Sequence, residues 1–121
     1  MVASFLPKAQ GPEFGAVSID LFLRLVVMAP LIETLIMAAI LEILLLALPR
    51  RWAIATSSIG WGIAHSLVAV AWGLVIWWPF LIFSTLYVIW RGQGRVQAIA
   101  IVFAVHALNN LGPALLLLRT T

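Results

Sequence analysis

The chain has 121 residues, of which 64% are hydrophobic and 9% are charged, with a net charge of +3 and no cysteine. A soluble domain carries about 25% charged residues, so this composition excludes an ordinary soluble protein. The lack of cysteine excludes disulfide bonds and thiolate metal sites. A mean hydropathy of +1.17 indicates a membrane protein. Its expected partner is the lipid bilayer, and membrane topology explains the basic residues better than nucleic-acid binding does.

The chain is expected to form a single membrane-embedded domain, with a polar N-terminal segment over residues 1–17 and a core over residues 18–118. The N-terminal segment lacks the apolar stretch of a cleavable signal peptide. Each of the four apolar runs that follow it is about long enough to cross a hydrocarbon core of ~30 Å. These runs cover residues 21–48, 52–72, 74–90 and 99–118. The sequence therefore predicts an all-α, polytopic transmembrane helical bundle of about four spans in the cell membrane.

The breaks between these runs indicate which ends share a face of the membrane. The first break reads Leu-Pro-Arg-Arg at 48–51 and the third reads Arg-Gly-Gln-Gly-Arg at 91–95, whereas the second lies near Gly73 and is uncharged. The first and third breaks lie on the same face and hold four arginines. The positive-inside rule predicts that this face is cytoplasmic and that both termini lie outside.

Pro30 interrupts the first run, where it removes a backbone donor and clashes with the carbonyl four residues earlier. We expect a kink that separates an N-terminal helix over 18–28 from a transmembrane part over 31–48. Aromatic residues near the span ends are expected to form interfacial belts. They are Trp52, Tyr87 and Trp90 on the arginine side and Trp72, Trp77 and Trp78 on the other.

Five polar or ionisable side chains interrupt the apolar runs at depth. A charged group at the bilayer centre costs about 2–3 kcal/mol or more, so such residues face the bundle interior and are candidates for function. They are Glu33, Glu42, His65, His106 and Asn110. A helix rises about 1.5 Å per residue, which puts all of these except Glu42 about 15–22 Å from the arginine-rich face. Three helices therefore deliver polar groups to one layer.

Helical phase separates Glu42 from this group. His106 and Asn110 are four residues apart and share a face of the last span. Trp61 and His65 have the same spacing, so the indole is expected to shield the imidazole. Glu42 follows Glu33 by nine residues and points the opposite way. It is expected to pair near Arg50 and Arg51 and to be structural.

A Glu, two His and an Asn in a dry cavity suit peptide hydrolysis. Glu33 is the candidate general base for a water molecule, with His65 beside it. His106 and the Asn110 amide are the candidate donors to the oxyanion. Glu33, His65 and His106 are also the zinc ligands if a metal is present. No HExxH sequence accompanies them, and a ligated Glu33 would lose its role as base, so no cofactor is favoured and zinc is the alternative.

Three short segments carry a resemblance to a known family. Ala-Pro-Leu-Ile-Glu-Thr-Leu at 29–35, Trp-Gly-Ile-Ala-His at 61–65 and His-Ala-Leu-Asn-Asn at 106–110 occur in the order of its three motifs. On these segments the chain resembles the CPBP family of CAAX proteases and bacteriocin-processing enzymes, also called Abi proteins. The resemblance covers about residues 25–118.

The resemblance implies an intramembrane endopeptidase that acts on a peptide or a membrane-protein substrate. Glu33 and His65 would activate water, and His106 and Asn110 would stabilise the oxyanion. Members are often called metalloproteases, although a metal-free glutamate mechanism is also proposed for the family. The family's first motif is Glu-Glu-x-x-x-Arg, whereas this chain has Thr34 at the second Glu and Ala38 at the Arg.

Two alternatives belong to other classes. The polar layer can instead fix helix packing in a non-catalytic membrane scaffold or immunity partner. The less favoured alternative is a bis-histidine haem protein with His65 and His106 as axial ligands, in which Glu33 and Asn110 have no evident role.

Overall fold

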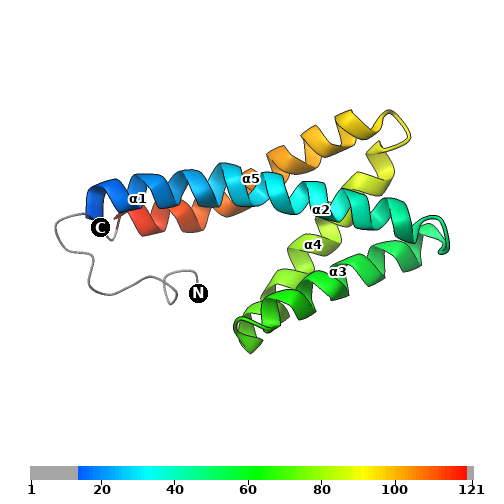
Figure 1. Ribbon diagram of the computed structural model, residues 1–121, viewed down its shortest axis with the longest axis horizontal. Coiled ribbons are helices and arrows are strands. Elements are labelled where there is room, and N and C mark those ends of the chain that lie inside the picture. The colour runs from blue at the N-terminus through cyan, green and yellow to red at the C-terminus, as the bar shows by residue number, and fades with distance from the viewer. Residues whose placement is uncertain (1–13, 120–121) are drawn as a thin grey trace.

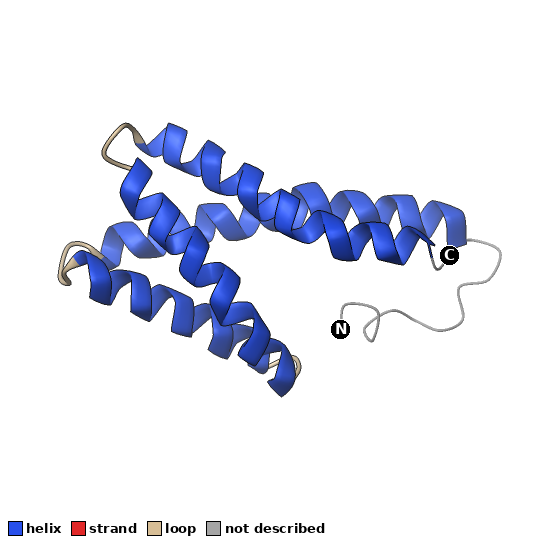
Figure 2. Cartoon of the chain, turned by 180° about the vertical axis from the view of Figure 1, so that it is seen from behind, coloured by secondary structure: helices blue, strands red, loops and turns tan. Residues whose placement is uncertain are grey.

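Helices make up all the regular structure in the part of the chain that the computed structural model describes, residues 14–119 (Figure 2). The predicted all-α helical bundle is confirmed. Residues 1–13 of the expected polar segment lie outside the described range, and the first helix begins inside that segment, at Phe14. The elements are α1 (Phe14–Leu23), the π-helix η2 (Arg24–Met28), α2 (Ala29–Leu44), α3 (Arg50–Ser66), α4 (Val70–Trp90) and α5 (Arg95–Arg119).

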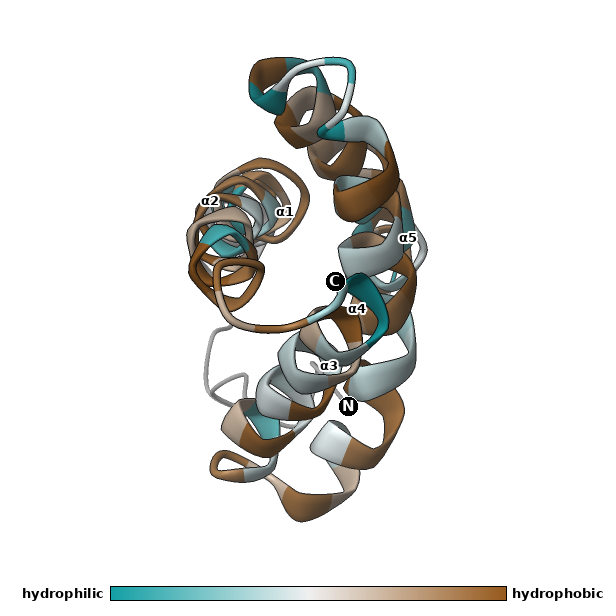
Figure 3. Cartoon of the chain, turned by 90° about the vertical axis from the view of Figure 1, so that its right-hand side faces the viewer, coloured by the Kyte–Doolittle hydropathy of each residue, from teal (hydrophilic) through white to brown (hydrophobic). Residues whose placement is uncertain are grey.

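Within residues 14–119, three helical stretches are long and apolar enough to cross a membrane, so this is a membrane protein by the length and composition of its helices. They are Ile19–Leu44, Val70–Trp90 and Arg95–Leu116. The helix α3 is not among them: it has 17 residues and ends at Ser66, well before the predicted end at residue 72. Figure 3 shows α3 as less hydrophobic than the other helices, with strongly hydrophilic residues gathered at the turns that face the viewer.

The N-terminal helix runs on as one long rod from α1 through η2 to α2, and this rod lies beside α5 (Figure 1). In η2 the Ala29 N–H donates to the carbonyl of Arg24, five residues earlier. In that register the next N–H would bond to the carbonyl of Leu25, but Pro30 has none. Pro30 therefore produces a π-helical segment just before itself. The separate helix predicted over 18–28 is wrong, and so is the transmembrane stretch predicted over 31–48.

The turns agree with the sequence at two places and differ at the third. Pro49 directly precedes α3, and Gly94 precedes α5 with φ of 151°, a conformation that side chains strongly disfavour. Both arginine-bearing turns lie at the same end of the molecule (Figure 1). The second turn lies at residues 67–69 rather than near Gly73, because α4 already begins at Val70. The helix then continues through Pro79 without a break. Neighbouring helices can satisfy the carbonyl that such a proline frees.

The hairpin of α3 and α4 has the most extensive helix–helix contact in the bundle. Two glycines, Gly62 on α3 and Gly73 on α4, allow this contact. A Cβ on Gly73 would overlap the Ser66 hydroxyl and the Gly62 carbonyl oxygen. Ser57 and Ser84 form a buried hydrogen bond of 2.9 Å across the same interface. The core then extends to α2 and α5 through large side chains that are fully or almost fully buried: Met37, Leu41, Phe80, Phe83, Tyr87 and Val102.

Glu42 ties three helices together at the end that carries the arginines. Tyr87 donates to Glu42 Oε2 at 2.7 Å, and Arg91 donates to both carboxylate oxygens at 2.8 and 2.6 Å. Arg95 adds an ion pair of 3.3 Å. Hydrogen bonding to the carboxylate raises the pKa of Arg91 above its usual value. Glu42 pairs at the arginine-bearing end as expected, but with Arg91 and Arg95 in place of Arg50 and Arg51. Tyr87, expected in an interfacial belt, is instead 1% exposed and lies in the core.

Gly73→Ala is expected to destabilise the protein, since the new Cβ meets the backbone of α3 as well as a side chain. Gly60→Ala is the matched control, because a Cβ there meets nothing within 4 Å and alanine is the better helix former by about 1 kcal/mol. Thermal unfolding in detergent, followed by tryptophan fluorescence, should show a lower Tm for Gly73→Ala alone. Equal Tm values for the two variants would contradict the close packing of α3 on α4.

Candidate active site

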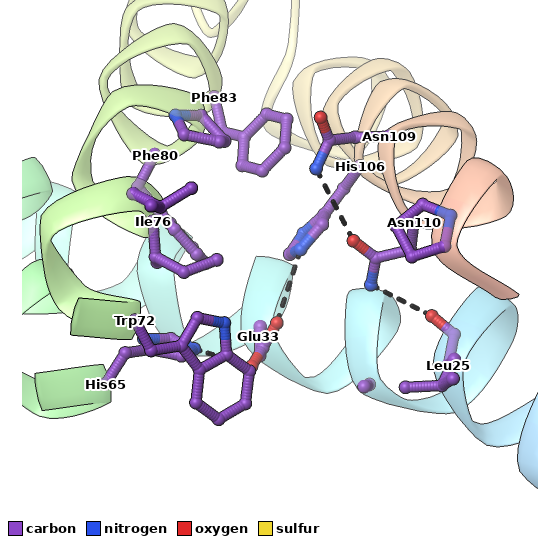
Figure 4. A pocket seen from close by; sticks show the side chains of 14 residues that line it. Leu25, Glu33, His65, Trp72, Ile76, Phe80, Phe83, His106, Asn109 and Asn110 are labelled. Carbon is purple, nitrogen blue, oxygen red and sulfur yellow. Dashed lines mark hydrogen bonds and ion pairs between the residues drawn. The ribbon is translucent and has the colours of Figure 1, made fainter. Parts of the chain in front are cut away.

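Three helices bring Glu33, His65 and His106 together, as the depth of these residues predicts. Glu33 Oε1 lies 3.2 Å from Nε2 of His106, and Glu33 Oε2 lies 3.7 Å from Nε2 of His65. Glu33 comes from α2, His65 from the C-terminal end of α3 and His106 from the middle of α5. Figure 4 shows the carboxylate between the two imidazoles. Each oxygen of one carboxylate thus faces a different histidine.

The three side chains line a cavity of about 390 Å³ between α2, the α3–α4 hairpin and α5. Its walls are mainly aliphatic and aromatic. The side chain of His106 is 4% exposed and that of His65 is 13% exposed, whereas Glu33 is 26% exposed. The carboxylate is therefore the part of the triad most open to the cavity.

Aromatic rings and one hydroxyl hold His106 in place. Phe83 stacks on the imidazole with a centroid distance of 4.3 Å, and Phe80 meets its face edge-on at 5.3 Å. Nδ1 lies 3.3 Å from the Thr34 hydroxyl oxygen. Because an ionised carboxylate only accepts hydrogen bonds, Nε2 of His106 carries the hydrogen that faces Glu33.

His65 is held in the opposite tautomer. Its Nδ1 lies 2.8 Å from the backbone carbonyl of Trp61, which only accepts, so Nδ1 carries the hydrogen. In the neutral ring the lone pair of Nε2 then faces Glu33. The Trp61 ring lies 5.9 Å from the imidazole, as its spacing predicts. Trp72 packs edge-on against His65 at 5.2 Å.

Asn110 lines the same cavity, but its amide reaches the rod of α1, η2 and α2. Its Nδ2 donates to the carbonyl oxygen of Leu25 at 2.9 Å. This is the carbonyl that Pro30 leaves without an N–H in the π-helical register. One amide hydrogen of Asn110 therefore closes the π-helix, and the second remains for a ligand. Asn109 donates weakly to the Asn110 oxygen at 3.5 Å.

Several residues in and beside the cavity were not expected to belong to the site. Thr34, Phe80 and Phe83 contact His106, and Asn109 lines the cavity beside Asn110. Helical periodicity carried a signal for Thr34, since it belongs to the buried stripe of α2. That stripe consists of Pro30, Thr34, Met37, Ala38 and Leu41. A buried hydroxyl on such a stripe needs a hydrogen-bond partner, either a carbonyl of its own helix or a group on another helix.

The same residues do not fit a metal ion in this arrangement. Glu33, His65 and His106 have suitable donor atoms for zinc, which requires their lone pairs to converge on one point at about 2 Å. Among residues 14–119, no three His, Asp or Glu side chains converge in that way. Both Nε2 atoms that a haem iron would need face the carboxylate.

Comparison of this chain with protein-family models, curated proteins and solved structures found no match. The resemblance to the CPBP family therefore stays a prediction that rests on the three motifs. The geometry of the site stands on its own contacts.

Asn110→Leu is expected to lower the stability of the bundle, because it leaves the Leu25 carbonyl unpaired in an apolar interior at a cost of about 1–3 kcal/mol. Asn109→Leu is the control, since Asn109 is exposed and its hydrogen bond is weak. Thermal unfolding of both variants in the same detergent measures the difference. A Tm for Asn110→Leu at or above that of Asn109→Leu would rule out the role of Asn110 in closing the π-helix.

Proposed function

We propose that this chain is an intramembrane endopeptidase, which hydrolyses a peptide bond with water activated by Glu33 and His65. The observation that supports this most is the position of one carboxylate between two histidines inside a largely apolar cavity. A base, its partner and a hydrogen-bond donor then lie within reach of one substrate group.

The water would bind between Glu33 Oε2 and Nε2 of His65, which are 3.7 Å apart and both accept hydrogen bonds. A water oxygen about 2.8 Å from each satisfies both acceptors. Glu33 takes one proton as the water oxygen bonds to the carbonyl carbon of the substrate. The C–N bond then breaks, and the same proton passes to the leaving amine. The products are a carboxylic acid and an amine, so the step balances.

His106 and Asn110 are the proposed donors to the oxyanion of the tetrahedral intermediate. The Nε2 hydrogen of His106 faces Glu33 Oε1 at 3.2 Å in the free site. Once Glu33 has gained a proton it attracts that hydrogen less, so the imidazole can turn its N–H to the developing charge. The second amide hydrogen of Asn110 is the other donor. In an apolar cavity each such donor acts more strongly than in water.

The proposed substrate is a peptide or a membrane-protein segment, since the cavity walls are apolar and lie within the bundle. We also propose that the reaction uses no metal, because Glu33 serves here as the base and His106 as a donor. Elemental analysis and activity assays before and after chelation test this point. The metal-free scheme would be overturned if the active protein holds stoichiometric zinc, loses its activity when the zinc is removed and regains it when zinc is added back.

A second candidate is a non-catalytic scaffold or immunity partner in the membrane. The bond from Asn110 to Leu25 favours it, because this polar contact joins two helices as packing contacts do. The two functions differ in their response to substitution. In a scaffold each polar residue contributes to stability, whereas a catalytic residue can be removed with little loss of stability.

We propose that the chain is a multi-pass protein of the cell membrane, with its arginine-bearing turns in the cytoplasm and α3 as a fourth, short crossing. The chain has no cysteine, so single cysteines can be placed at Val68, in the turn before α4, and at Gly92, in the turn before α5. An impermeant maleimide should label Val68→Cys on intact cells and Gly92→Cys only after permeabilisation. The reverse pattern would invert the orientation of α4, and equal labelling would show that α4 does not cross.

Glu33→Gln, His65→Ala and His106→Ala are each expected to abolish peptide cleavage while the protein stays folded. Loss of a general base costs at least ~10²-fold in rate. Asn110→Ala should have an intermediate effect, since one oxyanion donor contributes roughly 10²–10³-fold and His106 remains. The assay uses leader-type and tail-type membrane peptides, with the protein in detergent and in liposomes.

Glu42→Gln is the matched control for these variants, because it removes the same charge from α2 at a site that binds Arg91 and Arg95 instead. It should keep its turnover within a few-fold. Wild-type turnover in Glu33→Gln, or loss of turnover in Glu42→Gln alone, would show that the site lies elsewhere. If the wild type cuts no peptide and all four site variants lose stability, the scaffold is the better function.

A further inference from the structure

The hydroxyl of Thr34 is the only polar group within reach of Nδ1 of His106 among the contacts of the described residues. The two atoms are 3.3 Å apart, and both residues are buried, with Thr34 fully inaccessible. Thr34 follows Glu33 directly on α2, so one turn of helix presents both the carboxylate and the hydroxyl to α5. The imidazole of His106 is thus contacted at both nitrogens by neighbouring residues of one helix.

The direction of this hydrogen bond follows from the groups at the other nitrogen. Nε2 of His106 faces Glu33 Oε1 at 3.2 Å and must carry a hydrogen there. In the neutral ring Nδ1 therefore has a free lone pair. A threonine hydroxyl can donate or accept, so here it donates to Nδ1. The result is a chain of contacts from Thr34 through His106 to Glu33, which continues through His65 to the carbonyl of Trp61.

We propose that Thr34 is a positioning residue, which holds His106 in its Nε2–H tautomer and directs that hydrogen at Glu33. The Phe83 ring stacks on the imidazole and limits its tilt. Stacking does not distinguish the imidazole from the same ring rotated by 180° about its Cβ–Cγ bond, because both orientations lie in the same plane. A turned ring would present carbon to Glu33. The donated hydrogen bond at Nδ1 distinguishes the two orientations, because only one of them places nitrogen beside Thr34.

The part of this inference that concerns catalysis rests on the proposed function. If His106 serves a peptidase, loss of the Thr34 hydroxyl should lower kcat about 10- to 100-fold, the usual range for a residue that orients a functional histidine. KM should change little, since Thr34 is fully buried and does not line the cavity. The orientation of His106 itself can be measured without any substrate.

Imidazole nitrogen NMR is a direct test, because the chain has only two histidines. Protein labelled with ¹⁵N-histidine, in detergent micelles, should show one ring as the Nδ1–H tautomer and the other as the Nε2–H tautomer. His65→Ala assigns the remaining ring to His106. Its bare Nδ1 should show the shift of a hydrogen-bond acceptor.

Three variants complete the test. Thr34→Val keeps the shape but removes the hydroxyl, so the His106 Nδ1 signal should move to the position of a nitrogen without a hydrogen bond. Thr34→Ser should restore it. Thr85→Val is the control, since that hydroxyl donates to the Leu81 carbonyl in its own helix. Circular dichroism confirms that each variant is folded.

The outcomes separate the two proposals. An Nδ1–H tautomer for His106 in the wild type, or an unchanged Nδ1 signal in Thr34→Val, would overturn the role of Thr34 even if the protein cuts peptides. If the spectra are as expected but the wild type cuts no peptide, the positioning role of Thr34 is supported and only the peptidase proposal is contradicted. A kcat in Thr34→Val equal to that of Thr85→Val, with the expected spectra, would also overturn the effect on catalysis.

Discussion

The polar groups inside this bundle are arranged around one carboxylate, which lies among apolar side chains. Glu33 satisfies the requirement with an imidazole at each oxygen, and those imidazoles come from α3 and α5. Each histidine then needs a partner for its second nitrogen, which Trp61 and Thr34 provide. One carboxylate is therefore the point where polar groups from three helices meet. Polar groups in lipid have few other ways to be satisfied.

A second constraint lies in the backbone, where Pro30 leaves the Leu25 carbonyl without its N–H. The π-helix adds a residue to the turn before Glu33, and the Asn110 amide takes the place of the missing donor. Asn110 lies one turn beyond His106 on α5. The same face of α5 thus contacts both the Glu33 carboxylate and the π-helical backbone before it. π-Helical turns are frequent at functional sites, where they adjust the direction of nearby side chains.

Sequence reasoning was most successful where depth and helical phase were sufficient. The meeting of Glu33, His65 and His106 needed only the rise of a helix and the position of the arginines. It failed where the answer depended on which helices pack together. The partner of Glu42 is one case, since α2 ends against the α4–α5 turn. The turn expected near Gly73 is another, since α4 already begins at Val70. Thr34 carried a weak signal, but a hydroxyl in a span rarely indicates its partner.

The order of the site residues along the chain has a consequence for biosynthesis. Thr34 and His106 are 72 residues apart. At ~5–20 residues per second a ribosome needs about 4–14 s to cover that distance. During this interval the helix with Glu33 can enter the bilayer before α5 exists, and a buried carboxyl without partners costs about 2–3 kcal/mol there. The last helix therefore completes the site, and a nascent chain stopped before His106 should remain a better target for quality control than one that has passed it.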